Sequence, residues 1–303
     1  MRKAKGLGAK ANPGNASEFD SLVSSVEKSR GLLGPYEISD HLSARIEGLG
    51  LLDSLAHFEA HGYCVINDVY AHRDLDELTG VINTFATKDK GVIADGNAPY
   101  LLGRDPLVDK MVTHPKILAF AEVSVGNAFR VGQVAGSIKH KGGFVPDGVH
   151  SDQNWLPAPF PEHNCVITFC IPCEGMTDEE GATRIVPGSH LMRRHPNREE
   201  RFSQTRPIEV EKGGVAVWDG SVWHCSGARK ASGVRTMLHA TYQRFYTQPI
   251  DDYSYLLENH DYMKKAPKEM GLLLGERAFF GTGSEDKMVD VQKFEEAMVR
   301  TRL

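Results

Sequence analysis

The amino-acid sequence predicts a mainly β protein, a double-stranded β-helix of the cupin-like jelly-roll type, with helices packed on one of its sheets. From residue 129 onward, apolar and polar residues alternate in about eight short runs separated by turn residues, as an antiparallel two-sheet architecture requires. Before residue 129 the apolar residues recur at helical spacing instead. A chain of 303 residues suits one large domain, because all-β barrels of this size are often single.

The segment before the barrel is expected to supply the helices that cover the sheet. The expected elements are, in order, a helix over 42–61, a strand over 63–69, a helix over 74–86, a loop over 88–104 and a helical pair over 105–126. Gly48 and Gly50 weaken the middle of the first helix, and Gly62 is its expected end. Thr113 is the candidate cap of the helix that Pro115 begins.

The barrel core is expected over residues 129–246. Its predicted strands are 129–139, 144–152, 164–172, 182–187, 208–210, 214–218, 221–226 and 234–245. The turn residues between these runs favour antiparallel neighbours rather than parallel strands with helical crossovers.

The two ends of the chain differ in character from this core. Residues 1–40 are rich in glycine, serine and lysine, which predicts a mobile arm with one helical piece over 18–30. Residues 250–303 predict a helical or lid segment, with helices over 253–257, 270–280 and 290–299. No linker divides the folded part, so 41–303 is expected to form a single domain.

The bulk properties narrow the classes of partner. A formal net charge of −5 argues against nucleic acid, and no apolar run approaches the roughly 20 residues that span a bilayer. The first residues lack the apolar stretch of a secretory signal, so we expect a cytoplasmic protein. The weaker alternative is a peroxisomal address, because Thr301-Arg302-Leu303 loosely resembles Ser-Lys-Leu. The sequence leaves the oligomeric state open.

Five cysteines, an odd number, suit a reducing compartment in which the thiols stay free. Cys170 and Cys173 have the spacing of a redox pair, but they end an apolar strand-like run rather than begin a helix. We therefore expect buried structural thiols, and we rank a zinc site that includes Cys165 lower still.

The pattern that carries chemistry is His150-Ser151-Asp152 followed by His224. Two imidazoles and one carboxylate are the ligand set that holds Fe(II) on one face and leaves the other face open. On a strand, residues two apart point the same way, so His150 and Asp152 can reach one ion. His224 lies in a second short apolar run and is the expected third ligand.

Arg235 follows His224 by 11 positions (235 minus 224) and can point into the same cavity. Its planar guanidinium matches a carboxylate better than lysine would. Ser226, two residues after His224, can donate a further hydrogen bond.

These residues resemble the phytanoyl-CoA dioxygenase family of Fe(II)- and 2-oxoglutarate-dependent oxygenases. The resemblance runs from about residue 51 to 246 and rests on five ordered pieces. The pieces are Phe58-Glu59-Ala60-His61-Gly62-Tyr63-Cys64-Val65-Ile66, the His150-x-Asp152 step, Gly181-Ala182-Thr183-Arg184-Ile185-Val186-Pro187-Gly188-Ser189-His190, Gly213-Gly214-Val215-Ala216-Val217-Trp218, and His224 with Ser226 and Arg235. In the family, the positions of Ser226 and Arg235 hold the co-substrate.

The resemblance implies an enzyme that uses Fe(II), 2-oxoglutarate and O2, with ascorbate as a candidate reductant. It implies oxidation of a small-molecule metabolite by hydroxylation, desaturation, epoxidation or cyclisation, with release of succinate and CO2. A tailoring step in specialised metabolism is the favoured setting. Two alternatives stay open: a non-catalytic metal-binding jelly roll, and a cupin-like metalloenzyme that does not use 2-oxoglutarate.

The remaining polar and aromatic candidates are less distinctive. Gln133, on an earlier strand, is a candidate for the co-substrate cavity, and Trp155 is a candidate substrate wall or a core aromatic. Trp218 is expected in the core. His190 is expected in a turn or cap. The histidines expected to be structural are His140, His163, His195 and His239, and the cations expected on the solvated surface are Arg104, Lys139 and Lys141.

Overall fold

The computed structural model describes residues 36–87, 96–143, 148–153 and 155–276, to which every structural statement below refers. The expected N-terminal arm up to residue 35, the helical piece over 18–30 and the helix over 290–299 lie outside these ranges. So does the end of the helix expected over 270–280.

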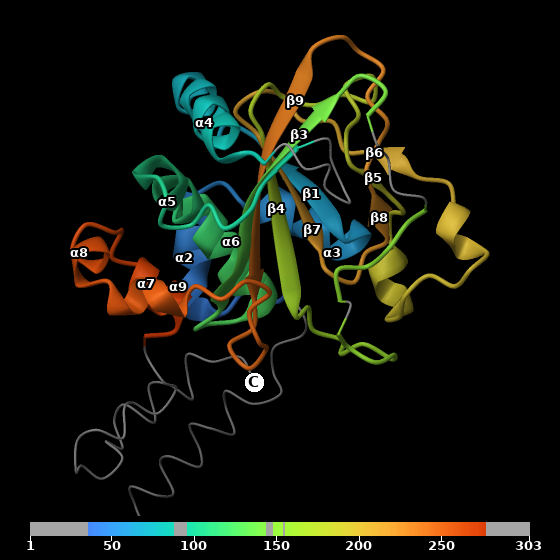
Figure 1. Ribbon diagram of the computed structural model, residues 1–303. Helices are drawn as coiled ribbons and strands as arrows, with labels where there is room; N and C mark the ends of the chain where they lie inside the picture. The colour runs from blue at the N-terminus through green and yellow to red at the C-terminus, as the bar shows by residue number, and fades with distance from the viewer. Residues whose placement is uncertain (1–35, 88–95, 144–147, 154, 277–303) are drawn as a thin grey trace, which may run out of the picture.

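The centre of the molecule is a six-stranded antiparallel sheet in the order β1-β7-β4-β9-β3-β2 (Figure 1). Its strands are β1 (Tyr63–Ile66), β2 (Gly96–Ala98), β3 (Arg130–His140), β4 (Val166–Pro172), β7 (Val215–Asp219) and β9 (Val234–Gln243). A three-stranded antiparallel sheet, in the order β6-β5-β8, lies on one side of it. Its strands are β6 (Arg206–Pro207), β5 (Arg184–Ile185) and β8 (His224–Cys225). Two antiparallel sheets with helices on the outer face are the predicted jelly-roll arrangement.

The strand register divides the large sheet into two faces. On β3 and β9, Val134 pairs with Ala240, and Gly136 with Leu238. Among these, Val134, Leu238 and Ala240 belong to the main apolar core under the helices. The alternate pairs, such as Ser137 with Met237, face the smaller sheet. One face of the sheet therefore holds the core, and the other is available to line a cavity.

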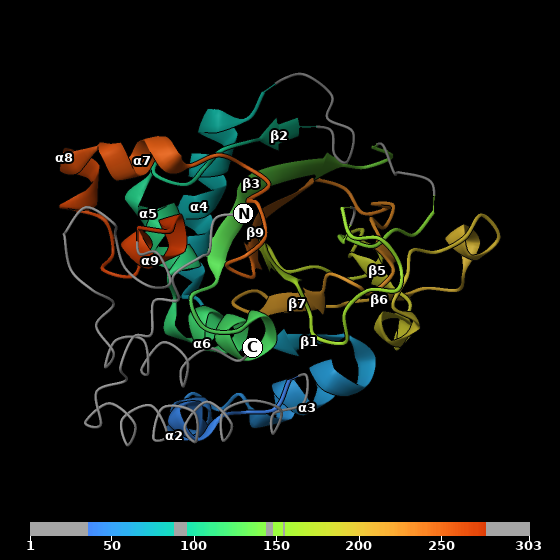
Figure 2. The ribbon, with the colours of Figure 1, turned by 90° about the horizontal axis from the view of Figure 1, so that it is seen from below.

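Helices cover the core face of the large sheet, as Figures 1 and 2 show. They are α2 (Asp40–Gly48), α3 (Leu52–His61), α4 (His72–Phe85), α5 (Pro106–Val112), α6 (Pro115–Val125), α7 (Ser254–Glu258), α8 (His260–Met263) and α9 (Met270–Leu274). A chain of edge-to-face aromatic contacts connects the layers. It runs from Phe58 to Phe120 at 5.1 Å, to Phe169 at 6.1 Å and to Tyr242 at 5.6 Å between ring centroids.

Most predicted elements are present, with shifted ends. The helix expected over 42–61 is broken into α2 and α3 at Gly48–Gly50, where Gly50 has a φ of 66°. Gly62 ends α3 in the left-handed conformation, as predicted (φ 79°). The segment expected to be a loop contains β2, and α8 was not anticipated.

Three predictions of local structure are wrong. Thr113 does not cap α6: it ends α5, and the side chain of His114 accepts from the amide of Lys116 at the start of α6. The segment predicted as a strand over 144–152 shows, in its described part, only an isolated bridge between His150 and His224. Gly148 has a φ of 78°, which interrupts extended geometry there. The strand expected at 208–210 lies at Arg206–Pro207.

Within the described ranges the longest helix is α4, with 14 residues. None of these helices therefore spans a bilayer, which takes about 20 residues.

Candidate metal centre and cavity

A cavity of about 280 Å³ opens between the two sheets. β3, β4, β7 and β9 supply one wall, and β8 with the residues that follow it supplies another. The expected site residues His150, Asp152, His224, Ser226, Arg235, Gln133 and Trp155 all line it. The fold thus brings together side chains from positions 133 to 235 of the chain.

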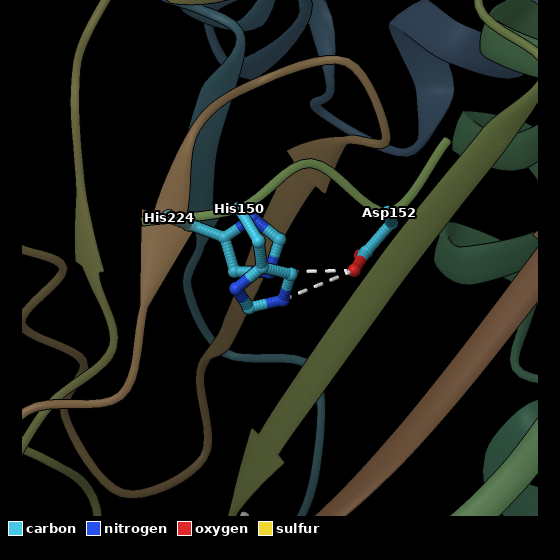
Figure 3. Close-up of side chains that lie close together, drawn as sticks. All are labelled: His150, Asp152 and His224. Atoms are coloured by element: carbon cyan, nitrogen blue, oxygen red, sulfur yellow. Dashed lines mark ion pairs between the residues drawn. The ribbon is translucent and has the colours of Figure 1, made fainter. Parts of the chain in front are cut away.

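His150, Asp152 and His224 point toward one another in this cavity (Figure 3). The Nε2 atoms of His150 and His224 lie 3.6 and 3.5 Å from Oδ1 of Asp152. One potential ligand atom from each of the three residues lies within 4.8 Å of the other two. Among the described residues, no other three His, Cys, Asp or Glu side chains come this close together. Ligands at right angles on one ion, with bonds of about 2.1 Å, lie roughly 3 Å apart. The donor types and separations therefore fit a divalent metal of the Fe(II) kind.

The backbone sets the positions of these ligands. The amides and carbonyls of His150 and His224 exchange two hydrogen bonds of 2.9 Å, which fix one histidine opposite the other. Between His150 and Asp152, Ser151 turns its hydroxyl the other way and donates to the carbonyl of Gly220 at 2.8 Å. The side chains of His150 and Asp152 thus share a side even though the segment is not a strand of the sheet.

Hydrogen bonds hold the ligand atoms in one orientation. Nδ1 of His224 contacts the carbonyl of Val222 at 3.1 Å, which leaves Nε2 toward the cavity. Thr168 Oγ1 and Trp218 Nε1 each donate to Oδ2 of Asp152 at 3.0 Å. Because Oδ2 is occupied by these donors, Oδ1 is the oxygen that faces the two imidazoles.

The local electrostatics favour the ligand forms of these groups. Burial lowers the pKa of His224 to about 4; the neighbouring Asp152 raises it and His150 lowers it, but burial has the larger effect. His224 is therefore neutral near pH 7, as a metal ligand must be. Burial alone would raise the pKa of Asp152, but His224, His150 and the Trp218 hydrogen bond outweigh it and keep the pKa below its usual range. Asp152 is thus a carboxylate.

Removing the indole donor tests this orientation. We expect Trp218→Phe to weaken Fe(II) binding about 10- to 100-fold, the usual cost of losing a partner of a metal ligand. Anaerobic metal titration measures the change. Trp223→Phe is the matched control, because Trp223 is equally buried (3% exposed for both) but donates to the carbonyl of Arg194, away from the cavity. Equal losses in the two variants would contradict the role of Trp218.

The cavity also contains a buried cation. The Arg235 side chain is 3% exposed, and its Nε and Nη1 atoms have no hydrogen-bond partner among the described residues. A buried donor without an acceptor is costly, so these atoms fit a site for an anionic ligand. Ser226 lines the same cavity, as expected. The pair fits the distal carboxylate of a dicarboxylic acid.

The two weaker candidates lie elsewhere in the cavity. Gln133 donates from Nε2 to Asp251 at 3.2 Å, so part of its hydrogen-bonding capacity is already used by the protein. Trp155 is 43% exposed, and it lines the cavity together with Ile250, which is 42% exposed. Such half-exposed apolar side chains fit the edge of the cavity better than a packed core.

Three residues have a different setting from the one predicted. His239, expected to be structural, lines the cavity and lies 3.1 Å from the hydroxyl of Ser137. Trp218 is buried as expected but contacts Asp152 rather than only the core. Lys139, expected on the solvated surface, is 1% exposed, whereas Arg104 and Lys141 are exposed as predicted. Alternation along the strand from Arg235 would have placed His239 on the cavity face.

The other predicted structural groups behave as expected. His190 contacts the carbonyl of Glu59 at 3.0 Å in a short 3-10 turn and takes no part in the cavity. All five cysteines are free. Burial raises the pKa of both Cys170 and Cys173 to about 12, the opposite of what a redox pair needs.

Comparisons with known proteins find several dioxygenases that are similar to this chain. The family model of phytanoyl-CoA dioxygenase (PhyH) matches residues 58–237, more than half of the chain. Dioxygenase af480 of Aspergillus fumigatus is 26% identical over 238 residues, which are 73% of each chain. Dioxygenase FUM3 of Gibberella moniliformis is 27% identical over 203 residues, 63% of this chain and 64% of that one. Dioxygenase andF of Emericella variicolor matches at 28% identity, and there the chain spans only 53% of the relative's length.

Solved structures share the fold at low identity. HygX from Streptomyces hygroscopicus, solved with nickel and 2-oxoglutarate bound, aligns with a TM-score of 0.56 at 15% identity over 65% of this chain and 89% of its own. SnoN, a non-heme α-ketoglutarate-dependent epimerase from nogalamycin biosynthesis, aligns with a TM-score of 0.52 at 19% identity over 67% and 84%. Both likenesses support the predicted jelly-roll fold.

Proposed function

The chain belongs to the phytanoyl-CoA dioxygenase family, and on this premise we propose that it is an Fe(II)- and 2-oxoglutarate-dependent dioxygenase of a small-molecule metabolite. The observation that carries the proposal is the placement of His150, Asp152 and His224 in one cavity with the buried cation Arg235. A metal triad alone would suit many chemistries. The triad together with a buried, partly unpartnered guanidinium is specific for an anionic co-substrate at the metal.

Each residue has a defined part in this proposal. His150, Asp152 and His224 hold the metal on one face, and Thr168 and Trp218 keep Asp152 in its binding orientation. Arg235 and Ser226 bind the distal carboxylate of 2-oxoglutarate and so orient its keto acid end toward the metal. When bound, iron and 2-oxoglutarate together supply oxidative decarboxylation, in which O2 is consumed, succinate and CO2 are released, and a substrate C–H bond is oxidised.

The cavity favours a neutral substrate. Among the described lining residues the side chains with full charge are Asp152 and Arg235, and both are assigned to the metal and the co-substrate. The half-exposed Trp155 and Ile250 provide apolar surface for the substrate, while Ser137 and His239 provide hydrogen bonds. This lining suits a largely apolar metabolite better than an acyl-CoA, whose phosphates need clustered cations. A tailoring step in specialised metabolism is consistent with such a substrate.

Two alternatives predict different results in the same experiment. Anaerobic addition of 2-oxoglutarate to the Fe(II)-loaded protein should produce a weak visible charge-transfer band, and oxygen should then release succinate. A metal-binding jelly roll without activity would give no succinate, and a metalloenzyme of another type would act without 2-oxoglutarate. Assays with and without ascorbate determine whether a reductant is needed.

The free thiols fit a reducing compartment, for which we propose the cytoplasm.

A further inference from the structure

A second buried cation lies beside Arg235. Lys139 on β3 is 1% exposed and is the direct cross-strand partner of Arg235 on β9. Paired residues in an antiparallel sheet have Cβ atoms about 5 Å apart and point to the same face. The fold therefore places two positive side chains next to each other in the interior. Polar groups nearby offset part of the repulsion between two such charges, and an anion beside them is attracted by both.

The contacts of Lys139 determine how Ser226 can bind. Lys139 Nζ donates to Ser226 Oγ, and it lies 2.9 Å from the carbonyl of Gly227. An ammonium group has donors and no acceptor, so Ser226 Oγ must accept this hydrogen bond. The single hydroxyl proton of Ser226 is then left to donate to another group. Because Ser226 lines the cavity, the available direction includes the site of the anion.

We propose that Lys139 is a positioning residue for the distal carboxylate of 2-oxoglutarate. It fixes the Ser226 hydroxyl as a donor toward that carboxylate and adds a second positive charge behind it. Lys139 does not itself line the cavity, so it acts through Ser226 and through its field rather than by direct contact. The inference rests on the proposed function, and it makes the cavity selective for 2-oxo acids that carry a second carboxylate.

The test compares two ligands that differ only at the distal end. 2-Oxopentanoate keeps the keto acid end of 2-oxoglutarate but has a methyl group in place of the distal carboxylate. Binding of each to the full-length, Ni(II)-loaded protein is measured by calorimetry, without turnover. We expect Lys139→Met to weaken 2-oxoglutarate binding about 10-fold, because the distal carboxylate loses both the fixed orientation of the Ser226 hydroxyl and a nearby positive charge. Binding of 2-oxopentanoate should change by less than about 2-fold, because it makes no distal ionic contact.

Two further variants separate positioning from general damage. Lys141→Met removes an exposed lysine two residues away and should leave both affinities unchanged. In a double-mutant cycle, Lys139→Met should cost less in the Ser226→Ala background than in the wild type, because part of its effect passes through Ser226. Full additivity, or an equal loss of binding for both ligands, would overturn the proposal.

The proposal stays testable if the methionine variant does not fold. Lys139→Gln retains a donor for Ser226 without the charge and should show a smaller loss. In wild-type protein labelled with ¹⁵N-lysine, the NMR resonance of the Lys139 ammonium should shift when 2-oxoglutarate is added and not when 2-oxopentanoate is added. The absence of such a selective shift would count against the role of Lys139. If the wild type binds no 2-oxoglutarate, the proposed function itself fails. If Arg235→Leu weakens binding and the Lys139 variants do not, this inference alone fails.

Discussion

Replacing Asp152 with alanine should abolish turnover. The variant loses the only carboxylate of the three-residue group and, with it, the charge that balances a divalent ion. Loss of a partner of a metal ligand costs about 10- to 100-fold, so loss of the ligand itself should reduce both Fe(II) affinity and succinate release by more than about 100-fold. Anaerobic Fe(II) titration and a succinate assay measure the two effects.

Ser151→Ala is the control for this experiment, because Ser151 is adjacent but turns its hydroxyl toward Gly220. It should retain iron binding. Asp152→Ala also leaves the buried donors of Trp218 and Thr168 without their acceptor, which costs about 1–3 kcal/mol per group. If that loss unfolds the alanine variant, Asp152→Asn keeps an acceptor oxygen and tests the ligand role alone. Normal turnover in a folded Asp152 variant would refute the metal assignment.

Replacing Arg235 with leucine should raise the requirement for 2-oxoglutarate steeply. The guanidinium is buried, and two of its nitrogen atoms have no protein partner among the described residues, so the incoming carboxylate is its expected partner. Removing one member of a buried charge pair costs about 2–5 kcal/mol, which corresponds to a loss of affinity of roughly 30- to 5,000-fold. Calorimetric titration of the Ni(II)-loaded variant measures this directly.

Arg235→Lys should give an intermediate affinity, because lysine keeps the charge but not the planar pair of donors. Binding of 2-oxopentanoate should be nearly unaffected in both variants. Should Arg235→Leu bind 2-oxoglutarate as tightly as the wild type does, Arg235 would have no role in the co-substrate site.

The meeting of His150, Asp152, His224 and Arg235 in one cavity could be predicted from residue type and spacing. His150 and Asp152 are two positions apart, and His224 and Arg235 occur in ordered motifs. The structure brings the predicted side chains together even though the local premise was wrong: the described part of 144–152 is no regular strand, and a single bridge to His224 aligns the two side chains instead.

Lys139, Trp218 and His239 could not be assigned with the same certainty, because their faces depend on pairing between distant strands. A register shift lies between Val131 and Gln133, and it sets which residues of β3 oppose β9. A lysine near the end of a strand is also usually exposed to solvent, so the sequence predicts a surface position for Lys139. Its burial follows from the segment after β8, which supplies Ser226 and Gly227 as hydrogen-bond partners.

The reciprocal amide–carbonyl pair of His150 and His224 links ion uptake to local rigidity. His224 lies on the two-residue strand β8, and this bridge ties the backbone of His150 to it. An ion that ties the two rings together should also suppress transient opening of that backbone. Hydrogen–deuterium exchange at the amides of His150 and His224 should therefore slow on loading with Ni(II), while exchange in the central strand β4 stays the same.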